Sequence, residues 1–196
     1  MKLDIILSGV GGQGILSIAT VIGEAATAAG LSLKQAEVHG MSQRGGDVQS
    51  NLRLSTEGIC SDLIPKGKAD LIIAMEPMEA LRYAPYLAPQ GWIATSAAPF
   101  VNIPNYPDQQ ALAAELAAFP HIVSLDIEAI AKEEKMPRSA NMILLGMAAP
   151  FFAGILTPAD LRAAIGRIFA AKGEDIVAVN QAAFDKGFAL ASEAAK

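Results

Sequence analysis

A glycine-rich turn near the start of the chain constrains the fold more than any other feature. The mostly apolar segment 3–7 leads into Gly9-Val-Gly-Gly-Gln-Gly14, and a run with helical periodicity follows. A G-x-G-x-x-G turn between a strand and a helix is typical of a phosphate-binding βα unit. We therefore predict an α/β fold whose first turn binds a phosphate-bearing ligand.

The glycines of this turn have distinct expected roles. Gly9 allows a sharp exit from the strand, Gly11 lets the backbone approach a diphosphate, and Gly14 lets the helix pack closely on the sheet. Free N–H groups at the start of the helix then attract an anion. The alternative is a tight turn without a ligand, but two adjacent glycines at 11 and 12 exceed what such a turn usually requires.

A second glycine-rich segment follows the predicted strand 31–37 and contains Gln43-Arg-Gly-Gly46. A guanidinium binds phosphate bidentately, and glycines expose their backbone N–H groups. We expect both glycine-rich segments at the carboxyl ends of strands. Glu37 stands about where a dinucleotide fold places its ribose-binding acid, and this residue favours NAD.

These two segments resemble those of the gamma subunit or domain of 2-oxoacid:ferredoxin oxidoreductases. Within that group, His39-Gly-Met-Ser-Gln-Arg-Gly-Gly46 is most similar to the small beta subunit of the indolepyruvate type. The similarity continues through residues 62–83 and 141–146 and is weakest over 102–118. It implies a single three-layer αβα domain over residues 1–196, with a mostly parallel sheet and a Rossmann-like first βα turn.

The resemblance also implies a function. Such subunits belong to enzymes that oxidatively decarboxylate a 2-oxoacid to its acyl-CoA, and this chain would help bind coenzyme A without catalytic residues of its own. It would be inactive in isolation. The residues expected at coenzyme A are Gly9, Gly11, Gly12, Gln13, Gly14, Gln43, Arg44, Gly45 and Gly46. Pyruvate-type relatives carry lysines near the second segment, where this chain has Gln43-Arg44.

The expected partner is a larger catalytic subunit. The resemblance places thiamine diphosphate, magnesium and iron–sulfur clusters on that subunit, and ferredoxin is engaged only indirectly. Three alternatives stay open: a gamma subunit of the pyruvate, 2-ketoisovalerate or 2-oxoglutarate type, a self-contained NAD-dependent enzyme, and a phosphate-ligand-binding module without a role in turnover. The 2-oxoacid is not determined by these residues, since it is selected near the thiamine on the partner.

Composition and charge exclude several classes. The 15 Lys and Arg residues are outnumbered by 20 Asp and Glu and form no basic stripe, so no nucleic-acid partner is expected. No apolar run is long enough to cross a bilayer, and no secretory signal opens the sequence, so we expect a cytoplasmic protein without a membrane partner.

The cysteine and histidines carry no expected chemistry. Cys60 is the sole cysteine, which excludes an internal disulfide and a Cys-ligated cluster, and we expect it to be structural and buried at a strand end. His39 and His121 lack partners at metal-ligand spacing, so no metal site is expected. Glu76 and Glu79 fit the start of a helix without a catalytic role.

Apolar patterning predicts the remaining elements. Strands are expected over residues 3–7, 31–37, 48–54, 69–75, 91–96 and 121–125, and the alternation in 48–54 indicates a half-exposed or antiparallel strand. Helices are expected over 126–135, 139–147, 160–171 and 175–194.

Two features leave alternatives open. Residues 97–108, which contain three prolines, are expected to form an exposed loop, with Phe100 and Tyr106 either anchored on a larger subunit or part of an ordinary connection. Asn141 is expected to hydrogen-bond at a helix start rather than contact a ligand or partner.

Overall fold

A six-stranded sheet forms the centre of the molecule. The computed structural model describes residues 1–39 and 46–194. In spatial order the sheet runs β2-β3-β1-β4-β5-β6. The strands are β1 (Lys2–Val10), β2 (Ser32–His39), β3 (Asp47–Ser55), β4 (Ala69–Ala74), β5 (Leu87–Ser96) and β6 (Ile122–Leu125). All six predicted strands are therefore confirmed.

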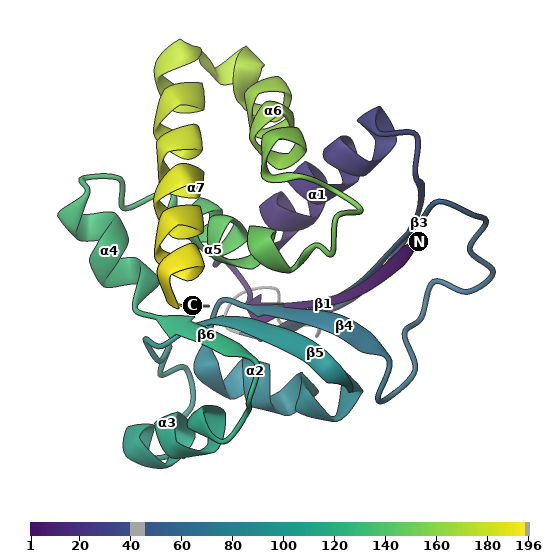
Figure 1. Cartoon of the computed structure of the whole chain (residues 1–196). Helices are drawn as coiled ribbons and strands as arrows, with labels where there is room; N and C mark the ends of the chain where they lie inside the picture. Colours follow the sequence, from purple (N-terminus) through teal and green to yellow (C-terminus); the bar gives the residue numbers. More distant parts are fainter. Residues whose placement is uncertain (40–45, 195–196) are drawn as a thin grey trace.

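Helices cover both faces of the sheet (Figure 1). In that view α1, α5, α6 and α7 lie above it, and α2 and α3 lie below. The helices are α1 (Ile15–Ala28), α2 (Pro77–Tyr83), α3 (Gln109–Ala117), α4 (Ile127–Glu133), α5 (Ala140–Ala148), α6 (Pro158–Phe169) and α7 (Glu174–Ala194), with 3-10 turns at Ala84–Tyr86, Ala149–Phe151 and Ala170–Lys172. The predicted three-layer αβα class and the four predicted helices are confirmed.

The strand directions divide the sheet into two parts. β1, β4, β5 and β6 are parallel, whereas β3 pairs antiparallel with both β1 and β2. The antiparallel direction, one of the two alternatives given for residues 48–54, is confirmed, and β3 has a neighbour on each side. As a result, β2 is separated from β1 by one strand.

The first strand is buried on both faces. Leu3, Ile5 and Leu7 belong to the cluster that packs under α1 and α5, whereas Ile6 points to the opposite face and joins Ile72. Parallel strands covered by helices on both sides need apolar residues at successive positions. This explains why residues 3–7 are mostly apolar.

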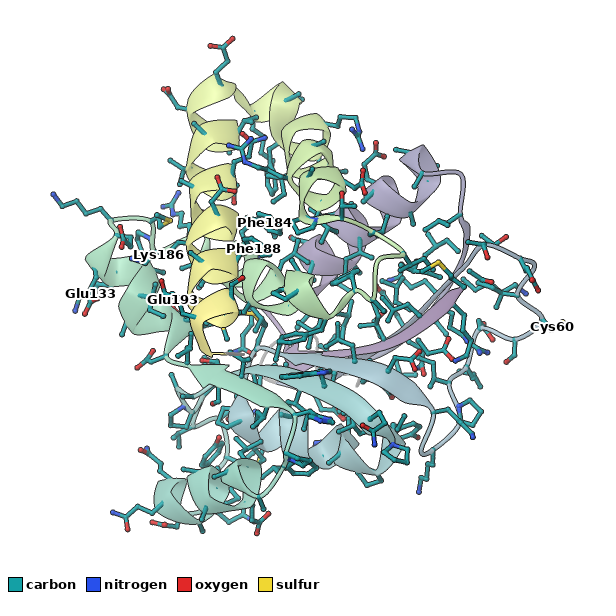
Figure 2. The ribbon with its side chains drawn as sticks, viewed as in Figure 1. Cys60, Glu133, Phe184, Lys186, Phe188 and Glu193 are labelled. Atoms are coloured by element: carbon teal, nitrogen blue, oxygen red, sulfur yellow. The ribbon has the colours of Figure 1, made fainter. Side chains whose placement is uncertain are left out.

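Two helices approach each other closely through glycines. A Cβ atom added at Gly146 of α5 would lie 2.0 Å from the Phe184 carbonyl oxygen, and one at Gly187 of α7 would lie 1.9 Å from the Ile143 carbonyl oxygen. Phe184 is fully buried, and Phe188 packs against the same cluster (Figure 2). The backbones of α5 and α7 are thus in direct contact.

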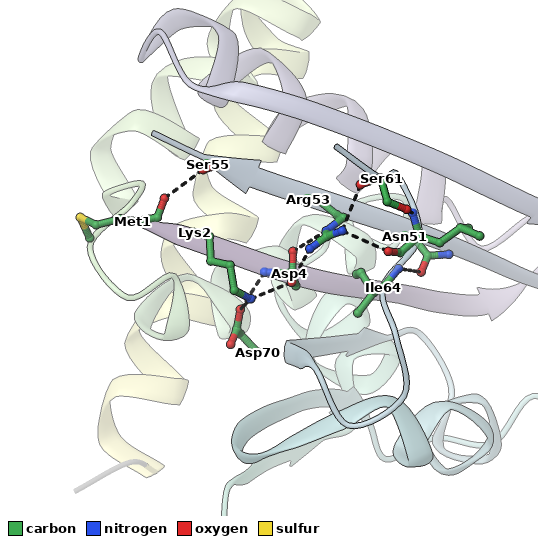
Figure 3. Close-up of polar contacts among 10 residues, drawn as sticks. Met1, Lys2, Asp4, Asn51, Arg53, Ser55, Ser61, Ile64 and Asp70 are labelled. Carbon is green, nitrogen blue, oxygen red and sulfur yellow. Dashed lines mark hydrogen bonds and ion pairs between the residues drawn. The ribbon is translucent and has the colours of Figure 1, made fainter. Parts of the chain in front are cut away.

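An ionic cluster around the buried Asp4 joins the amino ends of β1 and β4 to the carboxyl end of β3 (Figure 3). Asp4 is 2% exposed and accepts hydrogen bonds from Arg53 Nε at 2.8 Å and Lys2 Nζ at 2.7 Å. Burial opposes ionisation of Asp4, but these two cations hold the pKa of its carboxyl below the ordinary value. Arg53 also donates to the carbonyls of Ser61 and Leu63, which attaches the connection 56–68 to the sheet.

The prediction for Cys60 is wrong. It lies in the connection 56–68 rather than at a strand end, and its side chain is exposed (Figure 2). The connection is held by main-chain carbonyls that meet Arg53 and Lys34, so it does not need Cys60 for packing. Among the helices that the structure describes, none combines the length and apolar character needed to span a bilayer.

Candidate functional site

The conformation of the turn between β1 and α1 depends on two glycines with positive φ and on hydrogen bonds between Gln13 and Val10. Gly12 has φ +105° and Gly14, the N-cap of α1, has φ +87°, a left-handed region that other residues rarely adopt. Gln13 Oε1 accepts from the Val10 N–H at 2.7 Å, and the Gln13 N–H donates to the Val10 carbonyl at 3.1 Å. The predicted Rossmann-like turn therefore has a defined conformation, with no side chain capping the helix.

Two glycines have roles that differ from the expected ones. Gly9 still belongs to β1, where an added Cβ would lie 2.9 Å from Ile15 Cγ1, so it permits close packing and does not form the turn. An added Cβ at Gly14 would lie 2.7 Å from Asn141 Nδ2. Gly14 thus permits the approach of α5 rather than the packing of α1 on the sheet.

The two glycine-rich segments meet. Gln43, Arg44 and Gly45 lie outside the described residues, but Gly46 is described, and its carbonyl accepts the Gly11 N–H at 2.8 Å. The registers of β1 and β2 against β3 bring their carboxyl ends to the same edge of the sheet, as predicted. The Gly11 N–H is used by this bond, and the Gln13 N–H by its bond to the Val10 carbonyl.

A cavity of about 770 Å³ opens beside the turn. It lies at the carboxyl ends of β1 and β4, whose following helices α1 and α2 cover opposite faces of the sheet (Figure 1). Ligands of open α/β sheets bind at such a point. The volume is within the range of small-molecule sites. The cavity is lined by Gly11, Gly12, Gln13, Gly14, Ser17, Met75, Ala98, Pro99, Phe100, Glu128, Pro137, Arg138, Ala140 and Asn141.

Asn141 and Arg138 come to this cavity from the segment that opens α5. Asn141 Nδ2 donates to the Gly14 carbonyl at 3.2 Å, so its hydrogen bond spans 127 residues of sequence instead of staying within its own helix. The expectation of a local helix-start bond is wrong, because Gly14 leaves room for the amide. Arg138 was not among the residues predicted from the sequence. The feature that could have indicated it is its place in the basic segment Lys135-Met-Pro-Arg138, which connects two predicted helices.

A buried carboxylate attaches the loop 97–108 to the site. Glu76, fully buried, caps α2 by accepting from the Glu79 N–H at 2.9 Å, which confirms its predicted helix-start role. Its other oxygen accepts from the Phe100 N–H at 3.3 Å and from the Tyr106 hydroxyl. Burial raises the pKa of Glu76. The loop is present as predicted, and Phe100, 46% exposed, stands at the cavity.

A second polar contact holds the start of β3. The Tyr83 hydroxyl of α2 donates to the carboxylate of Asp47, with oxygen–oxygen distances of 3.1 and 3.2 Å. Burial and the nearby Asp47 raise the pKa of the Tyr83 phenol. Because Asp47 follows Gly46 directly, this contact fixes the end of the second glycine-rich segment on α2.

The position of Glu37 removes the main support for NAD. Its side chain is exposed and accepts from Gln35 Nε2 at 2.9 Å. β3 lies between β2 and β1. Glu37 on β2 is therefore two strand spacings, roughly 9–10 Å, from β1, the strand that leads into the glycine turn. In the dinucleotide fold these strands are neighbours.

Within residues 1–39 and 46–194, no group of three His, Cys, Asp or Glu side chains is placed to hold a metal ion.

Comparison with known proteins identifies the family. The pyruvate ferredoxin/flavodoxin oxidoreductase family matches residues 4–190. The chain belongs to this family. A relative from Pyrococcus horikoshii named indolepyruvate oxidoreductase subunit IorB is 34% identical over 200 residues, covering 98% of this chain and 97% of the relative. The Thermococcus kodakarensis protein of the same name is 37% identical over 153 residues, covering 74% and 75%.

A solved member of the family has the same fold. The 2-oxoglutarate:ferredoxin oxidoreductase of Magnetococcus marinus, solved with 2-oxoglutarate, coenzyme A and succinyl-CoA bound, matches with a TM-score of 0.77 at 26% identity. The match covers 98% of this chain but 31% of that longer one. The chain is thus a small subunit of a 2-oxoacid:ferredoxin oxidoreductase, and the family recognised from its two glycine-rich segments is confirmed.

Proposed function

We propose that this oxidoreductase subunit serves an indolepyruvate-type enzyme and binds coenzyme A in the cavity beside its glycine turn. The observation that carries the proposal is the open turn itself. Gly12 and Gly14 line the cavity, and a Cβ at Gly12 would meet nothing within 4 Å, so the backbone there is accessible to a ligand. Helix N-termini with free N–H groups bind phosphates.

The surroundings of the turn fit the chemistry of coenzyme A. Arg138 supplies a guanidinium for a phosphate, and Pro99 and Phe100 supply apolar surface for the pantetheine arm. The solved relative from Magnetococcus marinus was obtained with coenzyme A and succinyl-CoA. The indolepyruvate type is supported by the names of the curated relatives. Gln43, Arg44, Gly45 and Gly46 would flank the phosphates in this proposal.

The catalytic cofactors belong, in this proposal, to a larger partner subunit. The sequence contains one cysteine, so it cannot supply the four thiolates of an iron–sulfur cluster. The clusters would therefore lie on the partner, and by the family resemblance thiamine diphosphate and magnesium would lie there too, where the 2-oxoacid is bound and from which ferredoxin receives electrons. This chain would hold coenzyme A so that its thiol reaches the acyl group on that partner.

Ser17→Asp tests the coenzyme A site. Ser17 lies in the first turn of α1 and lines the cavity. An acidic side chain there favours the helix dipole, so the subunit keeps its fold, but it repels the phosphates of the ligand. In the assembled enzyme we expect the KM for coenzyme A to rise about tenfold, with the KM for indolepyruvate unchanged. Ser17→Ala, which removes the hydroxyl without adding charge, is the matched control.

The outcome separates the open alternatives. Equal KM values for coenzyme A in wild type and Ser17→Asp would contradict the site. Full turnover without this chain would favour a module with no part in the reaction, and micromolar NAD binding to the chain would favour the self-contained enzyme. A panel of 2-oxoacids distinguishes the indolepyruvate type from the pyruvate, 2-ketoisovalerate and 2-oxoglutarate types. Arg44 lies outside the described residues. We also expect Arg44→Ala to raise the KM for coenzyme A more than the KM for the 2-oxoacid.

A further inference from the structure

A second cavity continues from the first. It measures about 600 Å³ and shares Ser17, Pro137, Arg138 and Asn141 with the cavity beside the glycine turn. Its remaining walls come from the connection between α4 and α5, the end of α6 with the 3-10 turn that follows it, and the first half of α7. A ligand bound at the glycine turn can therefore extend into this space without leaving the protein surface.

The second cavity is positively charged. Lys135, Arg138 and Lys172 line it, and no Asp or Glu is among the described residues of its wall. In the described part of the chain none of these three cations forms an ion pair with a carboxylate. The whole chain has a net charge of −5, whereas the three cations give this cavity a local positive charge. Such a concentration of one sign attracts an anionic group.

One wall of the same cavity is apolar. Ile176 and Val179, on the first turns of α7, are 42% and 41% exposed there. Phe169 is half-buried, and Lys172 Nζ lies 5.2 Å from the centre of its ring. An apolar surface next to unpaired cations suits a ligand that has both a planar ring and a phosphate. An inorganic anion would use only the cations.

We propose that this second cavity binds the adenosine 3′-phosphate end of coenzyme A. The inference rests on the proposed function. In coenzyme A the adenosine carries the diphosphate at its 5′ position and a further phosphate at its 3′ position. With the diphosphate at the glycine turn, the adenine lies against Phe169, Ile176 and Val179, and the 3′-phosphate meets Arg138 and Lys172. The pantetheine arm then runs the other way, past Phe100.

The test compares coenzyme A with 3′-dephospho-coenzyme A in the assembled enzyme. Arg138→Gln and Lys172→Gln each remove one charge from an exposed side chain on a separate segment, so neither affects the core. We expect each to raise the KM for coenzyme A about tenfold, the cost of one charged hydrogen bond, and to change the KM for the dephospho form less than about twofold. Lys66→Gln, an exposed lysine at the opposite end of the sheet, is the control and leaves both values unchanged.

The result separates this inference from the proposed function. If both variants raise the two KM values by the same factor, or leave both unchanged, the cations do not meet the 3′-phosphate and the inference is wrong. Ser17 lines both cavities, so Ser17→Asp then tests the proposed function. If it raises the KM values for both ligands, the coenzyme A site at the glycine turn is supported. If both KM values are unchanged, the proposed site is wrong as well. Size-exclusion chromatography of each complex confirms assembly before the assay.

Discussion

At the scale of single residues, Gly14 and Asn141 form the contact on which the shape of the turn depends. Gly14→Ala places a methyl group 2.7 Å from Asn141 Nδ2 at a residue whose φ is +87°. We expect a loss of about 1–3 kcal/mol in the free energy of unfolding, part from backbone strain and part from the clash. Urea unfolding of the isolated chain measures it.

The double variant separates the two causes. In an Asn141→Ala background the clash is absent and only the strain at Gly14 remains, so Gly14→Ala should cost less there than in the wild type. An equal cost in both backgrounds would show that the amide of Asn141 does not occupy this space.

At the scale of elements, the contact between α5 and α7 depends on two residues without side chains. Gly187→Ala forces a methyl group into the carbonyl of Ile143, so the helices must separate, and we expect a loss of about 1–3 kcal/mol or more in unfolding free energy. Gly23→Ala in α1 is the matched control. Its Cβ would meet only Leu33 Cδ2 at 3.4 Å, and we expect a gain of about 0.5–1 kcal/mol. Similar effects of both changes would contradict the close packing.

The capping carboxylate of α2 makes stability depend on pH. Burial raises the pKa of Glu76 above the 4.5 of a free carboxyl, so the unfolded chain releases this proton at lower pH than the folded one. The stability of the folded state therefore falls as pH rises from about 4.5 through the raised pKa. Glu76→Gln abolishes this fall, and any packing penalty of the amide is the same at every pH.

Urea unfolding between about pH 4.5 and 7.5 checks this prediction. The stability of the Gln variant relative to wild type should increase with pH. A constant difference would mean that Glu76 titrates alike in both states. Glu79 also has a raised pKa and is present in both proteins, and its charge adds to the upward pKa shift of Glu76, so the measured difference includes the interaction between the two carboxylates.

The positions of the strands and helices along the sequence were largely predictable, but which strands lie side by side in the sheet was not. Periodicity located all six strands because it reports which faces are buried. The alternation in 48–54 indicated an antiparallel strand, but no local pattern reports that β3 inserts between β2 and β1 and so moves Glu37 away from the turn. Arg138 was missed for a similar reason, since its approach to α1 depends on the fold of the 135–139 segment and not on its sequence neighbours.

At the scale of the whole molecule, a negatively charged chain has to attract a negatively charged ligand. If coenzyme A binds as proposed, the net charge of −5 repels it at a distance, whereas Lys135, Arg138 and Lys172 attract it within a Debye length, about 8–10 Å at physiological salt. Salt screens the exposed local attraction, so raising ionic strength from about 0.05 to 0.5 M should raise the KM for coenzyme A.

Replacing all three cations by Gln lowers the net charge by three and removes the attraction that comes from the second cavity. The salt dependence of the KM for coenzyme A should then weaken or reverse, because screening now reduces a repulsive field. Comparing wild type and the triple variant on the same partner subunit cancels the partner's own charges. An identical salt dependence in the two enzymes would mean that coenzyme A approaches by a route that these cations do not influence.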